Sequence, residues 1–120
     1  MMNLKQAFIA AFYFLNLYYE ETNNEAFLDI VSGMNPFVWE DESSADPAAE
    51  RDWEAIANSI TIEAYLSPQQ AFQIMYEYVK FFKTEFGFNF DWIMEGLLEK
   101  THNDPKWMQC VSKSKEVCVG

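Results

Sequence analysis

The sequence holds few of the side chains on which most enzymes and metal sites depend. Its 120 residues include one histidine and two cysteines, fewer than the four ligands that a structural zinc site requires. Cys110 and Cys118 are too few for the framework of several disulfide bonds that small secreted proteins use. Glycine-rich phosphate loops and Gly-x-Ser-x-Gly motifs are also missing. We therefore expect no enzyme and no cofactor, and we expect reduced thiols in a cytoplasmic protein.

The N-terminal region lacks a hydrophobic run long enough to cross a membrane. The uncharged stretch QAFIAAFYFLNLYY covers 6–19, whereas a transmembrane helix needs about 20 apolar residues. No small-x-small cleavage pattern follows it, as a signal peptide would require. We expect this stretch to be a largely buried helix of a soluble protein.

Glycine and proline are scarce, with four of each, while half of the residues are hydrophobic and 18% are aromatic. This composition excludes the disordered and low-complexity classes. A chain of this length buries roughly two-thirds of the surface that its unfolded form exposes. We therefore predict one domain over residues 1–120, with a hydrophobic core that needs no metal or disulfide.

Capping residues mark the starts of the predicted helices. Asn3 with Gln6, and Ser67 with Gln70, have the spacing of a capping box. Asp-Pro pairs at 46–47 and 104–105 combine an aspartate cap with proline at the first helical position. With the 3.6-residue period of apolar side chains, they predict an all-α, single-domain bundle of about five to six helices. The expected helices cover 4–20, 24–32, 47–60, 68–86, 89–100 and a short segment from 105, with a frayed tail after Lys113.

Two features of the pattern leave alternatives open. The segment SITIEAYL at 59–66 alternates like a strand but also fits a helix that ends in a turn. A weak repeat at an offset of 64 residues matches QAF at 6–8 with QAF at 70–72. Either an internal duplication of 4–60 and 67–113 into two related three-helix halves or shared helix chemistry alone explains such matches.

Candidate metal and cofactor groups have simpler explanations. Glu99 and His102 have the Glu-x-x-His spacing of di-iron bundles, but such sites need two copies of the motif and further carboxylates. We therefore expect His102 to be a surface residue and predict no metal. Six aromatic residues have helical core spacing, and packing explains them better than a ligand pocket: Phe8, Phe12, Phe72, Phe81, Phe82 and Trp92.

Positive charge is rare, and the formal net charge is −11. The charge is uneven, because residues 1–63 carry a net of −10 and residues 64–120 carry −1. Such a field repels phosphate backbones and anionic lipids and speeds encounter with a basic partner. We expect no direct binding to nucleic acid or membranes.

The acids concentrate in one segment, with eleven Asp and Glu residues against one arginine between 20 and 54. Solubility does not require this clustering, because the second half of the chain lacks it. The alternative to a solvated face is a surface that binds a basic protein. Trp39 either folds back onto the core or serves as an aromatic anchor of that surface. The predicted partner-binding residues are Trp39, Glu40, Asp41, Glu42, Asp46, Glu50 and Glu54.

The stretches QAFIAAFYFLNLYYEETNN, FLDIVSGM and ADPAAERDWEAI, within residues 6–56, resemble small helical bacterial proteins encoded beside polymorphic toxins. Some of these are immunity proteins of contact-dependent growth inhibition systems. The relatives often have a glycine-containing turn before the Asp-Pro pair, where this chain has EDESSA. The resemblance implies a cytoplasmic protein that binds and neutralises a cognate toxin domain, often a nuclease. The alternative is a non-catalytic helical adaptor or structural module, either monomeric or a homodimer.

Overall fold

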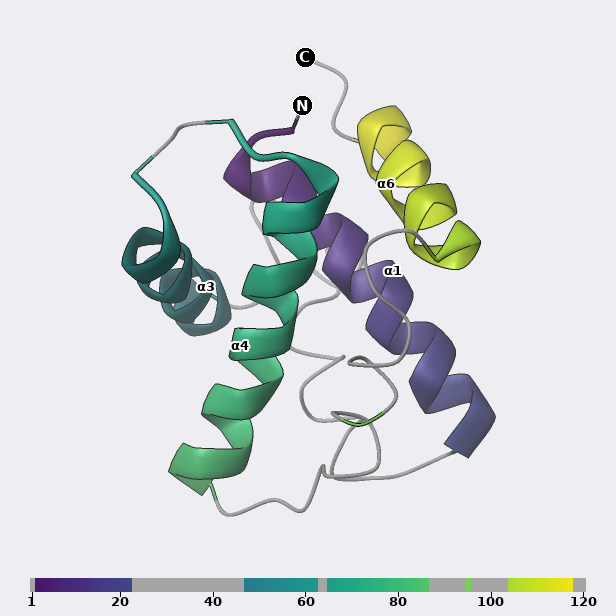
Figure 1. Ribbon diagram of the computed structural model, residues 1–120. Helices are drawn as coiled ribbons and strands as arrows, with labels where there is room; N and C mark the ends of the chain where they lie inside the picture. The colour runs from purple at the N-terminus through teal and green to yellow at the C-terminus, as the bar shows by residue number, and fades with distance from the viewer. Residues whose placement is uncertain (1, 23–46, 63–64, 87–94, 96–103, 118–120) are drawn as a thin grey trace.

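The computed structural model describes residues 2–22, 47–62, 65–86, 95 and 104–117 (Figure 1). Its regular structure consists of helices α1 (Leu4–Thr22), α3 (Pro47–Ile60), α4 (Pro68–Phe86) and α6 (Pro105–Val117). Within these ranges there is no strand, and one isolated β-bridge joins Met2 to Leu66. The all-α fold class is confirmed for this part of the chain. The helices expected at 24–32 and 89–100 lie outside it.

The two long helices begin with the same capping arrangement. At α1, the Gln6 N–H donates to Asn3 Oδ1 at 2.8 Å, and the Asn3 N–H donates to Gln6 Oε1 at 3.0 Å. At α4, the Gln70 N–H donates to Ser67 Oγ at 3.2 Å, and the Ser67 N–H donates to Gln70 Oε1 at 3.0 Å. Each box satisfies two backbone donors at a helix start. Both helices therefore begin where the sequence predicts, and each has 19 residues.

Helix α6 also begins as predicted but extends further. Asp104 Oδ1 accepts a hydrogen bond of 2.8 Å from the Lys106 N–H, as an aspartate cap does. The predicted frayed tail after Lys113 is wrong for the next residues, because the helix continues to Val117. Ser114 is buried there, and its hydroxyl donates to the Val111 carbonyl at 2.6 Å. The hydrophobic pattern did not predict these last residues of the helix, because the core position is held by the polar Ser114.

The segment at 59–66 is the end of a helix in its described part. Helix α3 includes Ile60, and the Thr61 N–H still donates to the Ala57 carbonyl at 2.9 Å. Leu66 then forms the isolated bridge to Met2 before α4 begins. The alternation of apolar residues therefore reflects a helix end and a buried turn residue.

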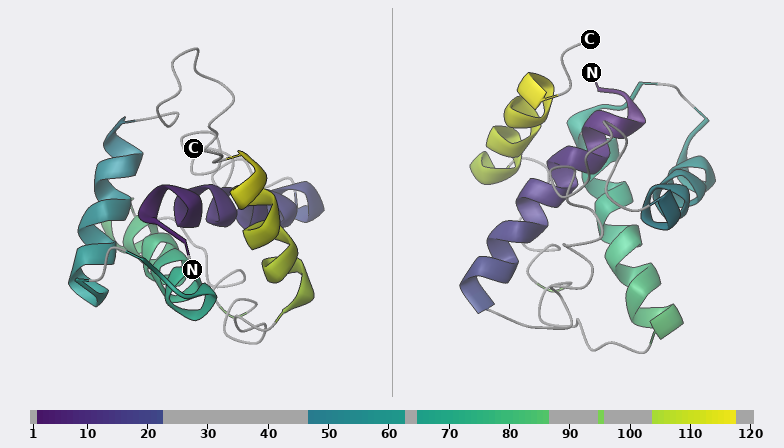
Figure 2. Two further views of the ribbon diagram at one scale, coloured as in Figure 1. Left: turned by 90° about the horizontal axis from the view of Figure 1, so that it is seen from above. Right: turned by 180° about the vertical axis from the view of Figure 1, so that it is seen from behind.

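Helix α1 is the central helix of the described fold. It contacts α3, α4 and α6, and all residues from Ala7 to Phe12 are buried. Helices α1 and α4 converge at their N-terminal ends, with α3 beside α4 and α6 beside α1 on opposite sides of the pair (Figures 1 and 2). Burial against three helices explains why 6–19 carries no charge. No helix in the described ranges is long and apolar enough to span a bilayer.

Most of the predicted core aromatics that the structure describes are in the core. Phe8, Phe12 and Phe72 are buried, and the partly buried Phe82 packs against them. Phe81 is half-buried and contributes to a surface groove described below. Trp92 lies outside the described residues.

Each outer helix inserts one buried tryptophan between α1 and α4. Trp107 of α6 contacts Phe14 and Phe72, with ring centroids 5.5 and 5.4 Å apart, and we call these three residues the Trp107 cluster. Trp53 of α3 contacts Phe8 and Tyr78, both at 5.5 Å, and we call these the Trp53 cluster. The Phe14–Trp107 rings are tilted at 56°, and the other three pairs meet edge to face. Aromatic pairs of this kind stabilise a core beyond their buried area.

The two clusters use equivalent positions of α1 and α4. Phe72 follows Phe8, and Tyr78 follows Phe14, by the same 64 residues at which the QAF motif recurs. Exchanging α1 and α4 at this offset therefore converts the ring contacts of Trp107 into those of Trp53. Met2 and Leu66 are also 64 residues apart, and they form two reciprocal backbone hydrogen bonds of 2.9 and 2.7 Å. Antiparallel residues exchanged by a local two-fold axis pair in this way.

Candidate functional site

The structure describes only part of the predicted acidic surface. Glu50 belongs to α3, and Glu54 is exposed on the same helix. The other predicted partner-binding residues lie outside the described residues: Trp39, Glu40, Asp41, Glu42 and Asp46. Helix α3 is therefore the described element on which the candidate site is built.

Helix α3 divides cleanly into an inner and an outer face. Trp53 and Ala57 are buried, and Ile56 and Ile60 pack against the core. The outer face follows the helical period and consists of Arg51, Glu54, Ala55, Asn58 and Ser59. Since Glu54 contributes nothing to the core, its charge is available to a partner.

Two apolar side chains are exposed where α3 gives way to α4. Ile62 is 98% exposed and Tyr65 is 61% exposed. Ile62 lies eight residues after Glu54, so it continues the outer face just beyond the last helical hydrogen bond. Single exposed apolar residues are common, but here two stand beside an acidic helix. Their exposure was not evident from the sequence, because their alternation with polar neighbours is also typical of a strand.

The two outer helices carry opposite charge. Helix α3 has Glu50, Asp52 and Glu54 against Arg51. Helix α6 has Lys106, Lys113 and Lys115 against Glu116. Because α3 and α6 flank the central pair on opposite sides (Figure 2), the charge differs across the molecule as well as along the chain.

The described residues offer no metal site. No group of three or more His, Cys, Asp or Glu side chains occurs among them that could hold a metal ion. The residues considered for metal binding, Glu99 and His102, lie outside the described ranges, as does Cys118.

Cys110 is buried between α6 and α1. Burial raises the pKa of its thiol from 9.0 to about 11, with Lys113 lowering it and Asp104 raising it by smaller amounts. The thiol is therefore protonated at neutral pH, whereas a nucleophilic or metal-binding cysteine needs the thiolate. This environment suits a small core residue.

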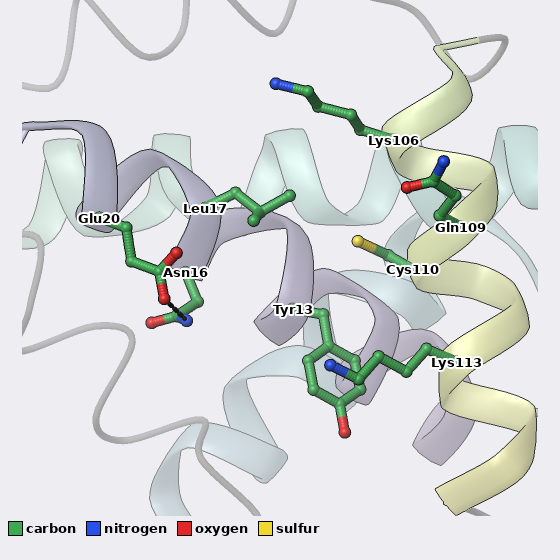
Figure 3. Close-up of a pocket in the computed structure, with 8 residues that line it drawn as sticks. All are labelled: Tyr13, Asn16, Leu17, Glu20, Lys106, Gln109, Cys110 and Lys113. Carbon is green, nitrogen blue, oxygen red and sulfur yellow. Dashed lines mark hydrogen bonds between the residues drawn. The ribbon is translucent and has the colours of Figure 1, made fainter.

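A groove of about 310 Å³ lies between α1 and α6, and we call it the α1–α6 groove. Figure 3 shows four side chains of α1 facing four of α6 across it: Tyr13, Asn16, Leu17 and Glu20, and Lys106, Gln109, Cys110 and Lys113. The chain's own polar groups are engaged there. Lys113 Nζ lies 4.3 Å from the centroid of the Tyr13 ring, and Asn16 Nδ2 donates to Glu20 Oε1 at 3.2 Å.

A second groove, of about 280 Å³, separates α3 from α4, and we call it the α3–α4 groove. Ile56 and Ser59 line it from α3. The side chains that line it from α4 are Glu77, Lys80, Phe81, Thr84 and Glu85. Ile56 and Phe81 give it apolar and aromatic surface, and α4 contributes two carboxylates and one lysine.

The two grooves occupy equivalent places in the fold. The four α1 residues of the first are 64 positions before Glu77, Lys80, Phe81 and Thr84 of the second. On the outer helices, Cys110 and Lys113 follow Ile56 and Ser59 by 54 positions, the separation of the two core tryptophans. In the sequence, this equivalence is indicated by the QAF repeat and by the capping boxes at the same offset, whereas the outer helices share few residue types.

Comparison with protein-family models, curated proteins and solved structures finds no match to this chain.

Proposed function

We propose that this protein is a non-catalytic immunity protein that binds and neutralises a cationic toxin domain, most readily a nuclease. The acidic segment at 39–54 forms the binding surface. The resemblance of residues 6–56 to immunity proteins supports the class of partner, and the charge distribution supports the binding mode. On this proposal the protein acts in the cytoplasm of the cell that makes it.

The finer architecture belongs to the same proposal. Residues 4–60 and 67–113 are two related halves of three helices each, which gives six helices in total. The equivalent capping boxes, tryptophan contacts and grooves support this relation.

One observation carries the proposed function. The same packing occurs twice, around Trp53 and around Trp107, but residues 1–63 have a net charge of −10 and residues 64–120 have −1. Folding therefore does not require the acids. In the segments that lead into the outer helices, 39–46 has four acids and no base, whereas 97–104 has two acids and a lysine. A demand other than packing or solubility accounts for the excess.

Charge and apolar contact have separate roles in the proposed binding. A nuclease needs a cationic groove for phosphate, and an acidic helical face attracts that groove over a Debye length of about 8 Å at physiological salt. The attraction raises the association rate, while buried apolar side chains slow dissociation. The exposed Ile62 and Tyr65 join Trp39 as candidate anchors for the bound state.

The decisive experiment uses the toxin domain from the reading frame beside the gene for this chain. We expect tight binding by the native protein. Simultaneous reversal of Glu40, Asp41 and Glu42 to lysine should slow association at least tenfold at low salt, with a smaller effect at high salt. Surface plasmon resonance over a range of salt concentrations measures both rates.

Glu116→Lys is the control, because this exposed residue belongs to α6, on the opposite side from α3. It should leave association within about twofold of the native rate, since a single exposed charge far from the interface has little effect. Equal binding by the native protein and the triple reversal would refute the acidic surface. A neighbouring gene with no toxin domain, or a domain that the native protein does not bind, would refute the immunity role.

A further inference from the structure

We propose that the α3–α4 groove binds a single arginine or lysine side chain of the partner protein. This inference rests on the proposed function, because it supposes a cationic partner, and it adds the position at which one cation is held. This groove and its equivalent between α1 and α6 differ in the charged groups that line them.

In the α1–α6 groove, the chain supplies its own cation. Lys113 extends from α6 across the groove, and its Nζ lies over the Tyr13 ring at 4.3 Å (Figure 3). An ammonium group over an aromatic face within about 6 Å is attracted by the ring quadrupole. One lysine of the chain itself thus reaches into this groove and contacts its aromatic ring.

In the α3–α4 groove, the position equivalent to Lys113 is Ser59. Its hydroxyl turns back to the helix and donates to the Ile56 carbonyl at 2.6 Å, so no cation reaches across from α3 at this position. The position equivalent to Tyr13 is Glu77. A carboxylate thus stands where the other groove holds the ring that receives the lysine.

The lining of the α3–α4 groove suits a long cationic side chain. Ile56 and the half-buried Phe81 offer apolar and aromatic surface to the aliphatic stem or to a guanidinium plane. Glu77 and Glu85 stand beside this surface and can pair with the charged head. Lys80 is exposed at the same wall and leaves a net charge of −1 among the groove's charged residues.

The location of the groove also fits the proposed docking surface. Ser59 belongs to the outer face of α3 that includes Glu54, and Ile62 follows three residues later. At a rise of about 1.5 Å per residue, Glu54 lies about 8 Å from Ser59 along the helix axis. One interface of ordinary size, about 800 Å² per partner, therefore covers the acid, the groove and the exposed apolar residues together.

The test supplies a cation from α3, the helix that gives this groove none. Ser59→Lys places a lysine where the equivalent groove has Lys113, next to Glu77, and it should fill the groove. Asn58→Lys is the matched control: it adds the same charge at the neighbouring exposed position of α3 but does not line the groove. Both variants should keep the native helical content, because both side chains are exposed.

The first probe is N-acetyl-L-arginine amide, titrated into the ¹⁵N-labelled protein at low salt. We expect saturable amide shifts at Ser59, Glu77, Phe81 and Glu85, and none at the equivalent positions of the α1–α6 groove. Ser59→Lys should weaken the probe's binding about tenfold, and Asn58→Lys should change it by less than threefold. Equal weakening by both variants, or shifts spread without saturation over the acidic residues, would overturn the inference.

The second probe is the toxin domain, and it separates the two proposals. Weaker binding by Ser59→Lys than by Asn58→Lys supports the groove. If the triple reversal at 40–42 weakens binding but the two lysine variants bind equally, the groove proposal fails and the acidic surface stands. If the triple reversal has no effect while Ser59→Lys weakens binding, the acidic segment fails as the docking surface and the cation site stands.

Discussion

The Trp53 and Trp107 clusters have the same ring contacts but differ in the hydrogen bonding of their indole N–H groups. Both indoles are fully buried and contact one aromatic ring from α1 and one from α4. The Trp107 indole N–H donates to the Pro68 carbonyl at 3.1 Å. The Trp53 Nε1 has no hydrogen-bond acceptor among the described residues. A hydrogen bond therefore adds to the packing of Trp107, whereas Trp53 is held by packing alone among the described residues.

The grooves repeat this difference at the surface. On the Trp107 side, Lys113 lies across the α1–α6 groove and contacts Tyr13. On the Trp53 side, the equivalent Ser59 leaves the α3–α4 groove without such a side chain. The same arrangement of aromatic rings therefore occurs twice in the chain with different polar groups around it. On the α6 side the chain supplies its own hydrogen-bond acceptor and cation, whereas on the α3 side we propose that a partner supplies the cation.

The largest expected effect tests whether both clusters support the core. Trp53→Ala and Trp107→Ala should each lower the free energy of unfolding by about 3–5 kcal/mol, because each removes a large buried ring and leaves a cavity. Guanidinium unfolding followed by circular dichroism measures the loss. A loss below about 1 kcal/mol at either site would show that this tryptophan does not support the core, and the comparison would fail.

The next effect should occur only on the α6 side and depends on pH. Burial raises the pKa of the Cys110 thiol from 9.0 to about 11, so between these values the unfolded chain loses a proton that the folded chain keeps. The free energy of unfolding therefore falls as pH rises through this window, by about 1.4 kcal/mol per unit at most.

Cys110→Ala is the control for this pH dependence, because it keeps every lysine and tyrosine that also titrates at alkaline pH. The native protein should lose about 2 kcal/mol more than Cys110→Ala between pH 9 and pH 11. Parallel stability curves for the two proteins would contradict the assigned burial of the thiol.

A smaller difference in stability measures the hydrogen bond of Trp107 separately from the packing of the two indoles. Trp107→Phe and Trp53→Phe remove similar volume, but only the first removes a hydrogen bond, with a net worth of about 1 kcal/mol. The second removes a buried donor that has no acceptor among the described residues, which relieves a cost of about 1–3 kcal/mol. Trp107→Phe should therefore be the less stable variant by about 2 kcal/mol in chemical unfolding. Equal stability would mean that the two indoles are equally satisfied.

The smallest effect should be equal in the two halves. Asn3→Ala and Ser67→Ala each remove the capping side chain of a long helix, at a cost of about 1 kcal/mol. Thermal unfolding of both variants at one pH measures the costs. A difference of more than about 1 kcal/mol between them would show that the two helix starts are not equivalent in stability.

Local chemistry made some features predictable from the sequence. The starts of α1, α4 and α6 depend on caps within three residues of the helix, and such signals can be recognised without tertiary contacts. The burial of Phe72 followed from the helical period, although Ile74 and Tyr78 are also buried because α4 packs against both α1 and α3.

Features that depend on distant contacts could not be predicted. Nothing near Trp107 indicates that Pro68 supplies its hydrogen-bond acceptor, because the two residues are 39 positions apart. The grooves likewise combine residues from helices far apart in the sequence. Of the predicted partner-binding residues, the exposure of Glu54 agrees with the proposed role, while Trp39, Glu40, Asp41, Glu42 and Asp46 lie outside the described residues. Their role stays a prediction.

The central position of α1 has a consequence for biosynthesis. This helix is the most apolar of the described helices, and α3, α4 and α6, which bury it, all follow it in the sequence. At translation rates of about 5–20 residues per second, about 5–20 s pass between the synthesis of α1 and that of the last residues of α6. During this interval the nascent chain exposes its most apolar segment, so its yield in a cell should depend on a chaperone that binds nascent chains at the ribosome.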